Sequence, residues 1–365
     1  MLILENVPLA PLNTLGVGGQ ARFFARASDE NHVVQALSFA RDRSLPVFTL
    51  GGGSNIVVAD AGFHGLVLKI EIPGIRRLDG GGMVAVGAGV EWDAFVQYCV
   101  NHDLAGVEAL SGIPGTAGGA PVQNIGAYGQ EVGETINAVR AWDSISERIV
   151  ELSRAECSFA YRSSVFNTSC AGRYTVLQTE FLLQPHGKPR VQYAELRARF
   201  AGGGVEDLSL AEVRGAVMDI RKSKGMLVSP DDLDSRSAGS FFRNPVVSRD
   251  EFAAMEQKAR ARGIISPSEA MPCFGAPEGK VKLAAAWLIE HSGFQKGFTH
   301  GRAGISTKHA LAIVNRGGAQ AVEIMSLMRL IKEQVFASFG VALLPEPVFI
   351  GFGEFLVNHG DGIKK

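Results

Sequence analysis

A run of three glycines between two short apolar stretches constrains the fold of this chain most strongly. Residues 51–53 are glycine, Ser54 and Asn55 follow, and the flanking stretches 46–50 and 56–59 are typical of β-strands. Glycines remove side chains where the backbone turns sharply and where another group approaches it closely. Backbone N–H groups beside a serine hydroxyl and an asparagine amide suit an anion such as the pyrophosphate of a dinucleotide. A simple glycine-rich hairpin is the alternative, because a lone glycine motif has low specificity.

A second glycine-rich segment, residues 111–129, interrupts the pattern of the chain around it. Its nineteen residues contain six glycines and two prolines, with Ser111, Thr116, Gln123 and Asn124 as hydrogen-bonding groups. An irregular loop of this length is uncommon in a compact domain unless it is functional or disordered. Its low charge and its apolar members argue against disorder. We therefore interpret it as a second ligand-binding loop.

The bulk composition is that of an ordinary globular protein. The 365 residues are 46% apolar and 20% charged, and this length is enough for two or three domains of about 100–200 residues each. The net charge of −1 gives no electrostatic reason to expect nucleic acid or a membrane surface as a partner. The four cysteines form no CxxC pair and the eight histidines are scattered, so we expect no metal site. Cys99 falls on the apolar face of a helical pattern, which favours a buried free thiol.

The N-terminal residues and the longest apolar run both argue against a membrane or secretory location. The first eight residues have no basic region and already include a proline, unlike a signal peptide. The longest unbroken apolar run is seven residues, 283–289, whereas a membrane span needs about 20. We expect a cytoplasmic protein.

Strand-like and helix-like patterns alternate in the first half of the chain, which favours a mixed α/β domain, and the helices and short strands that follow indicate a small second α/β domain. The patterns predict strands at 22–27, 46–50, 56–59, 65–70, 83–86, 136–142 and 174–183, with short strands near 310–314 and 348–350. They predict helices that begin at 28–30 and that cover about 91–101, 209–222, 249–261, 281–291 and 319–339. The glycines at 202–204 are expected to form a linker.

Familiar nucleotide and hydrolase motifs do not account for the sequence. Residues 16–21 match the dinucleotide fingerprint GxGxxA, but two prolines precede them and a strand follows where that motif needs a helix. There is no P-loop, no HExxH sequence and no GxSxG elbow.

Two local arrangements remain as candidates for chemistry. Ser240 lies between a glycine and two phenylalanines, so it is either a catalytic hydroxyl in a dry pocket or part of a turn with core aromatic residues. Glu346 lies between two prolines that restrict its backbone to an extended geometry. It is either a preorganised functional carboxylate or the end of a rigid loop, and the pattern alone does not distinguish these possibilities.

Six ordered segments together resemble one enzyme family. They are GGGSN at 51–55, SGIPGTAGGAPVQNIGAYG at 111–129, YRSS at 161–164, AGSFFRNP at 238–245, KLAAAWLIE at 282–290 and PEPVFIG at 345–351. The chain resembles the UDP-N-acetylenolpyruvoylglucosamine reductase (MurB) family over about residues 10–351. It is similar to the longer type, which carries a tyrosine-bearing loop that closes over the nucleotide.

The resemblance implies an α+β architecture with a vanillyl-alcohol-oxidase/PCMH-type FAD-binding fold in two subdomains and a smaller α/β substrate-binding domain. The expected boundaries are 1–70 and 71–205 for the FAD-binding subdomains, 206–351 for the substrate-binding domain and 352–365 for a tail. It also implies noncovalent FAD, NADPH as cosubstrate and a UDP-sugar enolpyruvyl ether as substrate. We expect a monomer.

The resemblance also assigns roles to individual residues. It implies that FAD contacts Gly51, Gly52, Gly53, Ser54, Asn55, Ser111, Gly112, Pro114, Gly115, Thr116, Gln123, Asn124, Gly126 and Tyr128. The substrate is expected to contact Tyr161, Tyr193, Lys224 and Asn244. The expected catalytic residues are Arg162, Ser240 and Glu346.

These residue types suit the reduction of an enol ether. Hydride addition to such a double bond needs cationic or hydrogen-bonding groups at the adjacent carboxylate, and the guanidinium of Arg162 binds carboxylates in a bidentate manner. Glu346 can assist only if it is protonated or if it orients a donor. The resemblance implies that Ser240 protonates the carbon next to the carboxylate, assisted through water or Lys224 because serine is a weak acid.

Two other functions remain open from the sequence. The first is another flavin oxidoreductase of the same cofactor fold, such as an alcohol oxidase. Covalent members of that group attach flavin through histidine or cysteine near the glycine loop, where this chain has Ser54 and Asn55. The second is a flavin-binding or nucleotide-sugar-binding protein without catalysis, against which the joint presence of Arg162, Ser240 and Glu346 argues.

Overall fold

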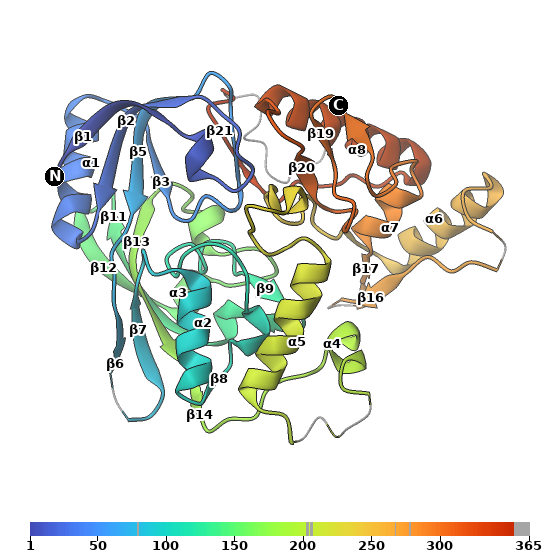
Figure 1. Ribbon diagram of the computed structural model, residues 1–365, viewed down its shortest axis with the longest axis horizontal. Helices are drawn as coiled ribbons and strands as arrows, with labels where there is room; N and C mark the ends of the chain where they lie inside the picture. The colour runs from blue at the N-terminus through green and yellow to red at the C-terminus, as the bar shows by residue number, and fades with distance from the viewer. Residues whose placement is uncertain (79, 202–203, 205–206, 267, 277–278, 354–365) are drawn as a thin grey trace. The chain divides into compact units, whose positions relative to one another are not determined.

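The computed structural model describes residues 1–353 except 79, 202–203, 205–206, 267 and 277–278. Most of the expected linker at 202–204 and most of the expected tail at 352–365 therefore lie outside the described residues. The chain divides into two compact units, each assembled from three stretches of sequence (Figure 1). The first unit comprises Met1–Val7, Ala21–Gly53 and His64–Leu227, and the second comprises Pro8–Gln20, Ser54–Phe63 and Val228–Lys365.

Two sheets form the framework of the first unit. One is four-stranded, with β3 and β5 parallel, in the order β1 (Ile3–Pro8), β2 (Gln20–Ala27), β5 (Phe63–Ile70), β3 (Val47–Leu50). The other is five-stranded and antiparallel, in the order β12 (Arg148–Ser153), β11 (Ile136–Asp143), β13 (Tyr174–Leu182), β7 (Met83–Gly87), β6 (Ile75–Arg77). Short two-stranded pairs join β8 (Leu104–Ala105) to β14 (Gln184–Pro185) and β9 (Gly126–Ala127) to β10 (Gln130–Glu131).

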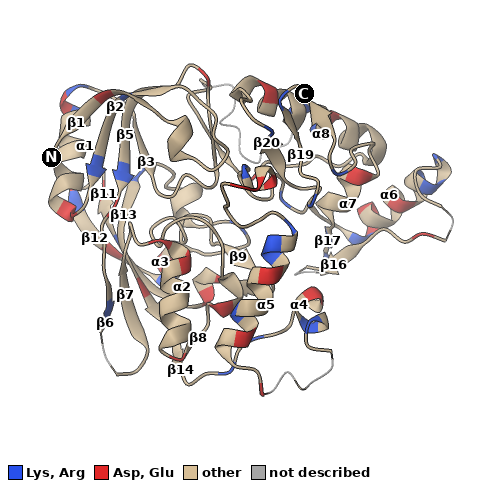
Figure 2. Ribbon diagram, viewed as in Figure 1, with Lys and Arg blue, Asp and Glu red and all other residues tan. Residues whose placement is uncertain are grey.

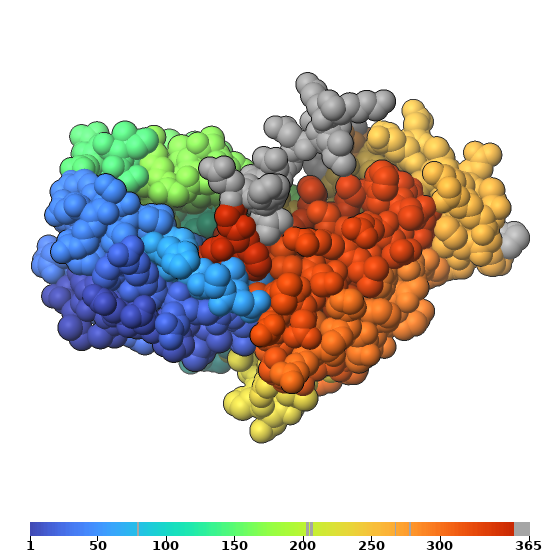
Figure 3. All heavy atoms as spheres, turned by 90° about the horizontal axis from the view of Figure 1, so that it is seen from above, coloured from blue at the N-terminus to red at the C-terminus, as the bar shows by residue number. Residues whose placement is uncertain are grey.

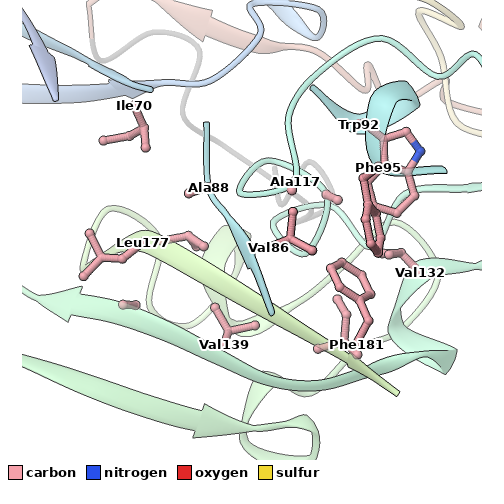
Figure 4. Packing of buried hydrophobic residues seen from close by; sticks show 14 of the residues in the cluster. Ile70, Val86, Ala88, Trp92, Phe95, Ala117, Val132, Val139, Leu177 and Phe181 are labelled. Atoms are coloured by element: carbon pink, nitrogen blue, oxygen red, sulfur yellow. The ribbon is translucent and has the colours of Figure 1, made fainter. Parts of the chain in front are cut away.

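The helices α1 (Glu30–Asp42), α2 (Trp92–Asn101) and α3 (Arg154–Cys157) bury apolar residues in one core with the strands of these sheets. The first unit also contains α4 (Ala194–Ala198) and α5 (Leu210–Ser223). Trp92 and Phe95 of α2 contact Phe181 of β13, with ring centroids 6.0 and 4.6 Å from the Phe181 ring (Figure 4). The three side chains are at most 1% exposed, and burying large aromatic surfaces of this kind is a major source of stability. Cys99 lies in the same core, and burial raises the pKa of its thiol.

The last helix of the first unit, α5, carries a separate small core. Its residues Val213, Val217 and Ile220 pack on Leu196 of α4, and all four are buried. Ser209 caps the helix by accepting a hydrogen bond from the Glu212 N–H group, and Glu212 bonds back to Ser209. The helix also packs on α2 and on the short helix η2 (Glu108–Leu110), which directly precedes the glycine-rich loop.

The second unit is built from short strands and three helices in the part of it that the structure describes. Its sheets have the orders β15 (Val246–Val247), β17 (Val281–Leu283), β16 (Cys273–Gly275) and β18 (Thr299–His300), β19 (Ala303–Ile305), β20 (Ile313–Asn315). A further sheet consists of two parallel strands, β4 (Ile56–Val58) and β21 (Val348–Ile350). The helices are α6 (Arg249–Ala261), α7 (Ala285–Glu290) and α8 (Ala321–Phe339).

The long helix α8 provides much of the second core. One face, including Ile324, Leu327 and Ile331, is fully buried, while Val322 and Phe336 are exposed. The orange-red atoms of this helix lie at the surface in Figure 3. Its first N–H groups are satisfied by Asp60, whose carboxylate accepts hydrogen bonds from Ala321 and Val322 at 2.7 and 3.0 Å.

The grouping of the chain into two units follows these contacts. Residues 54–63 belong to the second unit because β4 pairs with β21 and Asp60 binds α8. Residues 207–227 group with the first unit, where α5 packs on α2. The assignment of cofactor and substrate to the expected domains 1–70, 71–205 and 206–351 stays a prediction.

Most of the predicted helices and strands are present, with shifts of one to three residues at their ends. The helix predicted at 281–291 is wrong in its first part. Residues 281–283 alternate Val-Lys-Leu and pair with strands on both sides, and Ala284 is extended, so α7 begins only at Ala285.

Among the described residues, no helix combines the length and apolar character needed to cross a bilayer.

An ion pair between a buried aspartate and a half-buried arginine, at one end of the five-stranded sheet, gives a test of stability. Asp143, 2% exposed, accepts two hydrogen bonds from Arg173 at 2.8 and 2.7 Å and one from the Ile145 N–H group at 3.0 Å. The hydrogen bonds from Arg173 hold the pKa of Asp143 well below its usual range, and they outweigh burial, which acts in the opposite direction.

We expect Asp143→Asn to lower the free energy of unfolding at pH 7 by about 1–3 kcal/mol, because the Arg173 guanidinium and the Ile145 N–H group lose a charged, buried acceptor. A carboxyl with a depressed folded pKa stabilises the protein above its unfolded pKa, near 3.9, and this contribution is lost as pH falls below that value. Denaturant unfolding at several pH values should therefore show that the difference between wild type and variant shrinks as the pH is lowered from about 4 towards the depressed folded pKa. An unchanged difference over that range would contradict the assignment.

Candidate active site

The two glycine-rich segments approach each other closely in the first unit. A Cβ atom placed on Gly52 would lie 2.6 Å from the Gly115 Cα atom, and one placed on Gly51 would lie 2.8 Å from the Thr116 Oγ1 atom. Real Cβ atoms do not come this close, so glycine is required at residue 52, where the neighbour is backbone, whereas a larger residue at 51 would displace the Thr116 side chain. The sequence pattern predicted that another group comes close to the backbone of residues 51–53. The structure identifies residues 115 and 116 of the second glycine-rich segment as such a group.

Lys69 fixes the start of the first glycine segment, and the sequence analysis did not identify it. Its Nζ atom donates a hydrogen bond to the Gly51 carbonyl at 3.0 Å. Burial lowers the pKa of Lys69 from its ordinary value. The available signal was a lysine within the apolar strand at 65–70, where a charged side chain needs a partner.

Thr116 presents a polar atom that suits a ligand. Its Oγ1 atom is buried and has no hydrogen-bond partner among the described residues. Buried hydroxyls are usually satisfied, so such an atom next to bare glycine backbone marks a place where a ligand can supply the missing partner. The phosphates of a dinucleotide are typically held by backbone N–H groups of glycine-rich turns and by hydroxyl donors. The residues therefore fit FAD at this position.

Other polar residues of the second loop fasten it to its surroundings. The Asn124 side chain, 2% exposed, donates to the Glu131 carboxylate at 2.8 Å and to the Ala160 carbonyl at 2.9 Å, and accepts from the Gly133 N–H group at 2.8 Å. The Ser111 hydroxyl donates to the Glu108 carbonyl at 2.7 Å. These bonds give both residues a role in shaping the loop. Contact of either one with FAD stays a prediction.

Arg162 lies against the same loop. Its backbone has a left-handed conformation with φ of 54°, and its Nη2 atom donates to the Gly126 carbonyl at 2.7 Å. Its guanidinium carbon lies 5.4 Å from the ring centroid of Tyr161. The structure thus brings together three predicted site residues, and the bond to Gly126 orients the guanidinium.

A second group of predicted residues surrounds the end of α5. The Tyr128 and Tyr193 rings meet edge to face, with centroids 5.7 Å apart. Burial raises the pKa of Tyr128 to about 12 and also raises the pKa of Tyr193. Lys224, which caps the C-terminus of α5, forms an ion pair with Glu195 at 2.6 Å.

Arg221 belongs to this group, although it is not among the predicted site residues. Its Nη2 atom donates to the Met226 carbonyl at 2.9 Å, while its Nε atom is buried without a partner among the described residues. Burial lowers the pKa of this guanidinium, and the nearby Tyr128 and Asp93 act in the opposite direction. Basic residues gather in this last turn of α5 (Figure 2). Such a site favours an anion.

The remaining catalytic candidates lie in the second unit, where backbone pairing brings them together. The Arg243 N–H group donates to the Leu344 carbonyl and the Glu346 N–H group donates to the Phe241 carbonyl, both at 2.9 Å. Ser240 directly precedes this paired segment and is half-buried. Ser240 and Glu346 are therefore neighbours across one short antiparallel contact, although 105 residues separate them in the sequence.

Asn55 joins this cluster. Its Nδ2 atom donates to the Glu346 carbonyl at 3.3 Å, and its own carbonyl accepts from the Val348 N–H group at 3.0 Å. Asn244, four residues after Ser240, accepts a hydrogen bond from the Ala285 N–H group at 3.0 Å, at the start of α7. Both amides therefore have structural partners, and their contacts with ligands stay predictions.

The other predicted residues are distributed between the two units. The first unit contains Gly53, with φ of 67°, and the loop residues Gly112, Pro114 and Gln123, whereas Ser54 belongs to the second unit.

No group of three or more histidine, cysteine, aspartate or glutamate residues suited to a metal ion occurs in the part of the chain that the structure describes.

Comparisons with known proteins match both halves of the chain. Residues 21–153 match a family model described as FAD binding domain. Residues 231–350 match one described as UDP-N-acetylenolpyruvoylglucosamine reductase, C-terminal domain.

Relatives of nearly full length carry the same name. The UDP-N-acetylenolpyruvoylglucosamine reductase of Thermobifida fusca is 44% identical over 95% of this chain and 98% of its own length. That of Streptomyces coelicolor is 43% identical over 95% of this chain and 90% of its own length. That of Ralstonia nicotianae is 39% identical over 96% of this chain and 99% of its own length.

A solved structure shows the same fold. The crystal structure of the UDP-N-acetylenolpyruvylglucosamine reductase (MurB) from Thermus caldophilus covers 96% of this chain and 100% of its own chain, with a TM-score of 0.65 and 24% identity. Together with the FAD-binding match, it confirms the expected α+β class with a FAD-binding fold. The chain therefore belongs to the UDP-N-acetylenolpyruvoylglucosamine reductase family.

Proposed function

We propose that this chain reduces UDP-N-acetylglucosamine enolpyruvate to UDP-N-acetylmuramate, with FAD as cofactor and NADPH as reductant, in the synthesis of peptidoglycan precursors. The reaction adds a hydride to the methylene carbon and a proton to the carbon that bears the carboxylate, and NADPH becomes NADP⁺. Bound FAD supplies the hydride transfer between the two substrates. The observation that carries the proposal is the backbone pairing that sets Ser240 beside Glu346 in a chain whose family is that of the reductases.

The glycine-rich segments would hold FAD without a covalent bond. Gly51 and Gly52 allow the two loops to meet, and Thr116 offers there a buried hydroxyl that has no partner among the described residues. Neither segment 51–55 nor segment 111–129 contains a histidine or cysteine that could form a covalent link to flavin.

Arg162 would bind the substrate carboxylate. The bond from its Nη2 atom to the Gly126 carbonyl fixes the plane of the guanidinium, so less side-chain freedom is lost when an anion binds. A cation at this position stabilises the negative charge that develops on the carboxylate as the hydride is added. The basic end of α5, with Arg221 and Lys224, would bind the anionic part of a nucleotide.

Ser240 would donate the proton. Its position beside Phe241, whose carbonyl accepts from the Glu346 N–H group, ties the hydroxyl-bearing segment to the rigid Pro-Glu-Pro turn. A positioned donor of this kind protonates the carbon from one side only, which would define the stereocentre of the lactyl group.

The direct test of the function follows the flavin colour of the purified protein under anaerobic conditions. NADPH alone should bleach the bound flavin, and addition of the enolpyruvyl nucleotide should then restore the colour. Restoration by oxygen but not by the nucleotide would indicate an oxidase. Failure to bind flavin at all would indicate a different function.

Acid treatment tests how the flavin is held. Precipitation of the holoprotein with acid should release the yellow chromophore into the supernatant, because no covalent attachment residue is available in either loop. The absorbance of supernatant and pellet measures the partition, with a covalent flavoprotein treated in parallel as control. Colour retained in the pellet would contradict noncovalent binding.

Replacement of Ser240 by alanine should separate the two half-reactions. We expect flavin reduction by NADPH to stay within about twofold of wild type. Reoxidation by the enolpyruvyl nucleotide should slow by about 10²–10⁴-fold, the usual contribution of a general acid. Stopped-flow absorbance of the flavin measures both steps.

Ser237→Ala provides the matched control. The Ser237 hydroxyl accepts a hydrogen bond from the Gly239 N–H group at 3.2 Å, so its loss removes a turn contact in the same segment. A turn contact is worth about 1 kcal/mol of stability and should affect both half-reactions alike, if at all. If Ser240→Ala behaves like Ser237→Ala, Ser240 is a turn residue and not the proton donor.

A further inference from the structure

An ion pair between α2 and α5 also holds the start of the second glycine-rich loop. Asp93, in the first turn of α2, accepts two hydrogen bonds from the Arg214 guanidinium of α5, at 2.7 Å each. The same carboxylate accepts a hydrogen bond from the Gly112 N–H group at 2.6 Å. One carboxylate thus connects two helices and a loop, in a bidentate geometry that restricts rotation of both side chains.

The pair is well shielded and has further support. The side chains of Arg214 and Asp93 are 11% and 27% exposed, and Arg214 also donates to the Gln97 side chain at 2.8 Å. Burial acts to raise the pKa of Asp93, but the hydrogen bonds from Arg214 and Gly112 outweigh it, so the carboxylate stays ionised at neutral pH.

Gly112 is the residue through which Asp93 acts on the loop. Its φ of +70° lies in the left-handed region, and a Cβ atom there would come within 2.6 Å of Leu227 and 2.7 Å of Met218. With no side chain, Gly112 is oriented through its backbone, and its N–H group is directed at Asp93. Asp93 therefore fixes the residue at which the loop begins.

The same face of α5 reaches the other end of the loop. Arg214, Met218 and Arg221 follow at intervals of four and three residues, so they share one side of the helix. Met218 and Arg221 lie around Gly112, and Arg221 also interacts with Tyr128 near the end of the loop. Displacement of α5 would disturb both ends of the loop together with Lys224 at the end of the helix.

We propose that Asp93 and Arg214 are positioning residues that hold the cofactor loop and the basic end of α5 in one fixed arrangement. This inference rests on the proposed binding of FAD by the loop. Neither residue was singled out by the sequence, and neither needs to contact the cofactor or the substrate for this role. The pair would act on FAD affinity through Gly112, and on nucleotide binding through α5.

The pair Asp143–Arg173 is a close chemical match for the control. It too joins a shielded aspartate to an arginine through two hydrogen bonds, and its aspartate also accepts from a loop N–H group. Its partners lie at the β11–β12 turn and just before β13, in the same unit but outside both glycine-rich segments. Loss of this pair should affect stability without acting on the loop.

The experiment compares Asp93→Asn with Asp143→Asn and Arg214→Met with Arg173→Met. For each variant, FAD affinity is measured by titration of the apoprotein with FAD, followed by flavin absorbance and fluorescence, and stability by denaturant unfolding.

We expect Asp93→Asn to weaken FAD binding by at least tenfold and Arg214→Met to weaken it less, because the Asp93–Gly112 bond remains. In Arg214→Met, the KM for the enolpyruvyl nucleotide should rise more than kcat falls. Both control variants should keep FAD affinity within threefold at a similar loss of stability.

Three results would overturn the inference. FAD affinity within threefold of wild type in Asp93→Asn would show that the carboxylate does not control the loop. An equal loss in Asp93→Asn and Asp143→Asn would show a general effect of stability. If Asp93→Asn fails to fold, Arg214→Met replaces it in the test. Unchanged FAD affinity and an unchanged KM for the enolpyruvyl nucleotide in Arg214→Met would show that the ion pair does not control the loop. A wild-type chain that takes up no FAD would refute the proposed function itself, before any variant is compared.

Discussion

The close approach of two glycine-rich segments is the constraint on which the first unit depends. Gly52 comes so near Gly115 that a side chain at residue 52 would clash with the backbone of the second segment. Neighbouring elements contribute hydrogen bonds to both segments, from Lys69 to Gly51 and from Gly112 to Asp93 of α2. Backbone without side chains is poorly stabilised by packing, so its geometry has to be imposed by neighbours such as the Lys69 ammonium and the Asp93 carboxylate.

The sequence was most informative where chemistry forces a particular residue type. The two glycine-rich segments, the prolines around Glu346 and the order of the six motifs were enough to predict the α+β class and the family. Repeating hydrophobic patterns predicted most elements because helices and strands bury one face each. The strand at 281–283 was missed because a short apolar run followed by alanines also fits a helix, and only its two partner strands decide between them.

Residues that act through distant partners could not be found in the same way. Lys69, Asp93 and Arg221 look like ordinary polar residues in their local patterns, and their importance lies in the backbone groups and ions they meet. Asn124 shows the converse case. The resemblance implies that it contacts the cofactor, and the structure adds that its amide makes three bonds within the protein. A side chain's type indicates what it can bind, but only the fold determines which partner it meets.

The interleaving of the two units affects how the chain can fold during synthesis. Asn55 is bonded to Glu346, which lies 291 positions later, and β4 pairs with β21 near the end of the described chain. A ribosome therefore releases the segment around β4 long before its partner strand exists. Closing so long a loop is slow, and unpaired strands promote aggregation in the meantime. The second unit cannot be completed from its C-terminal stretch alone, so cutting the chain at residue 227 would deprive it of β4 and Asp60.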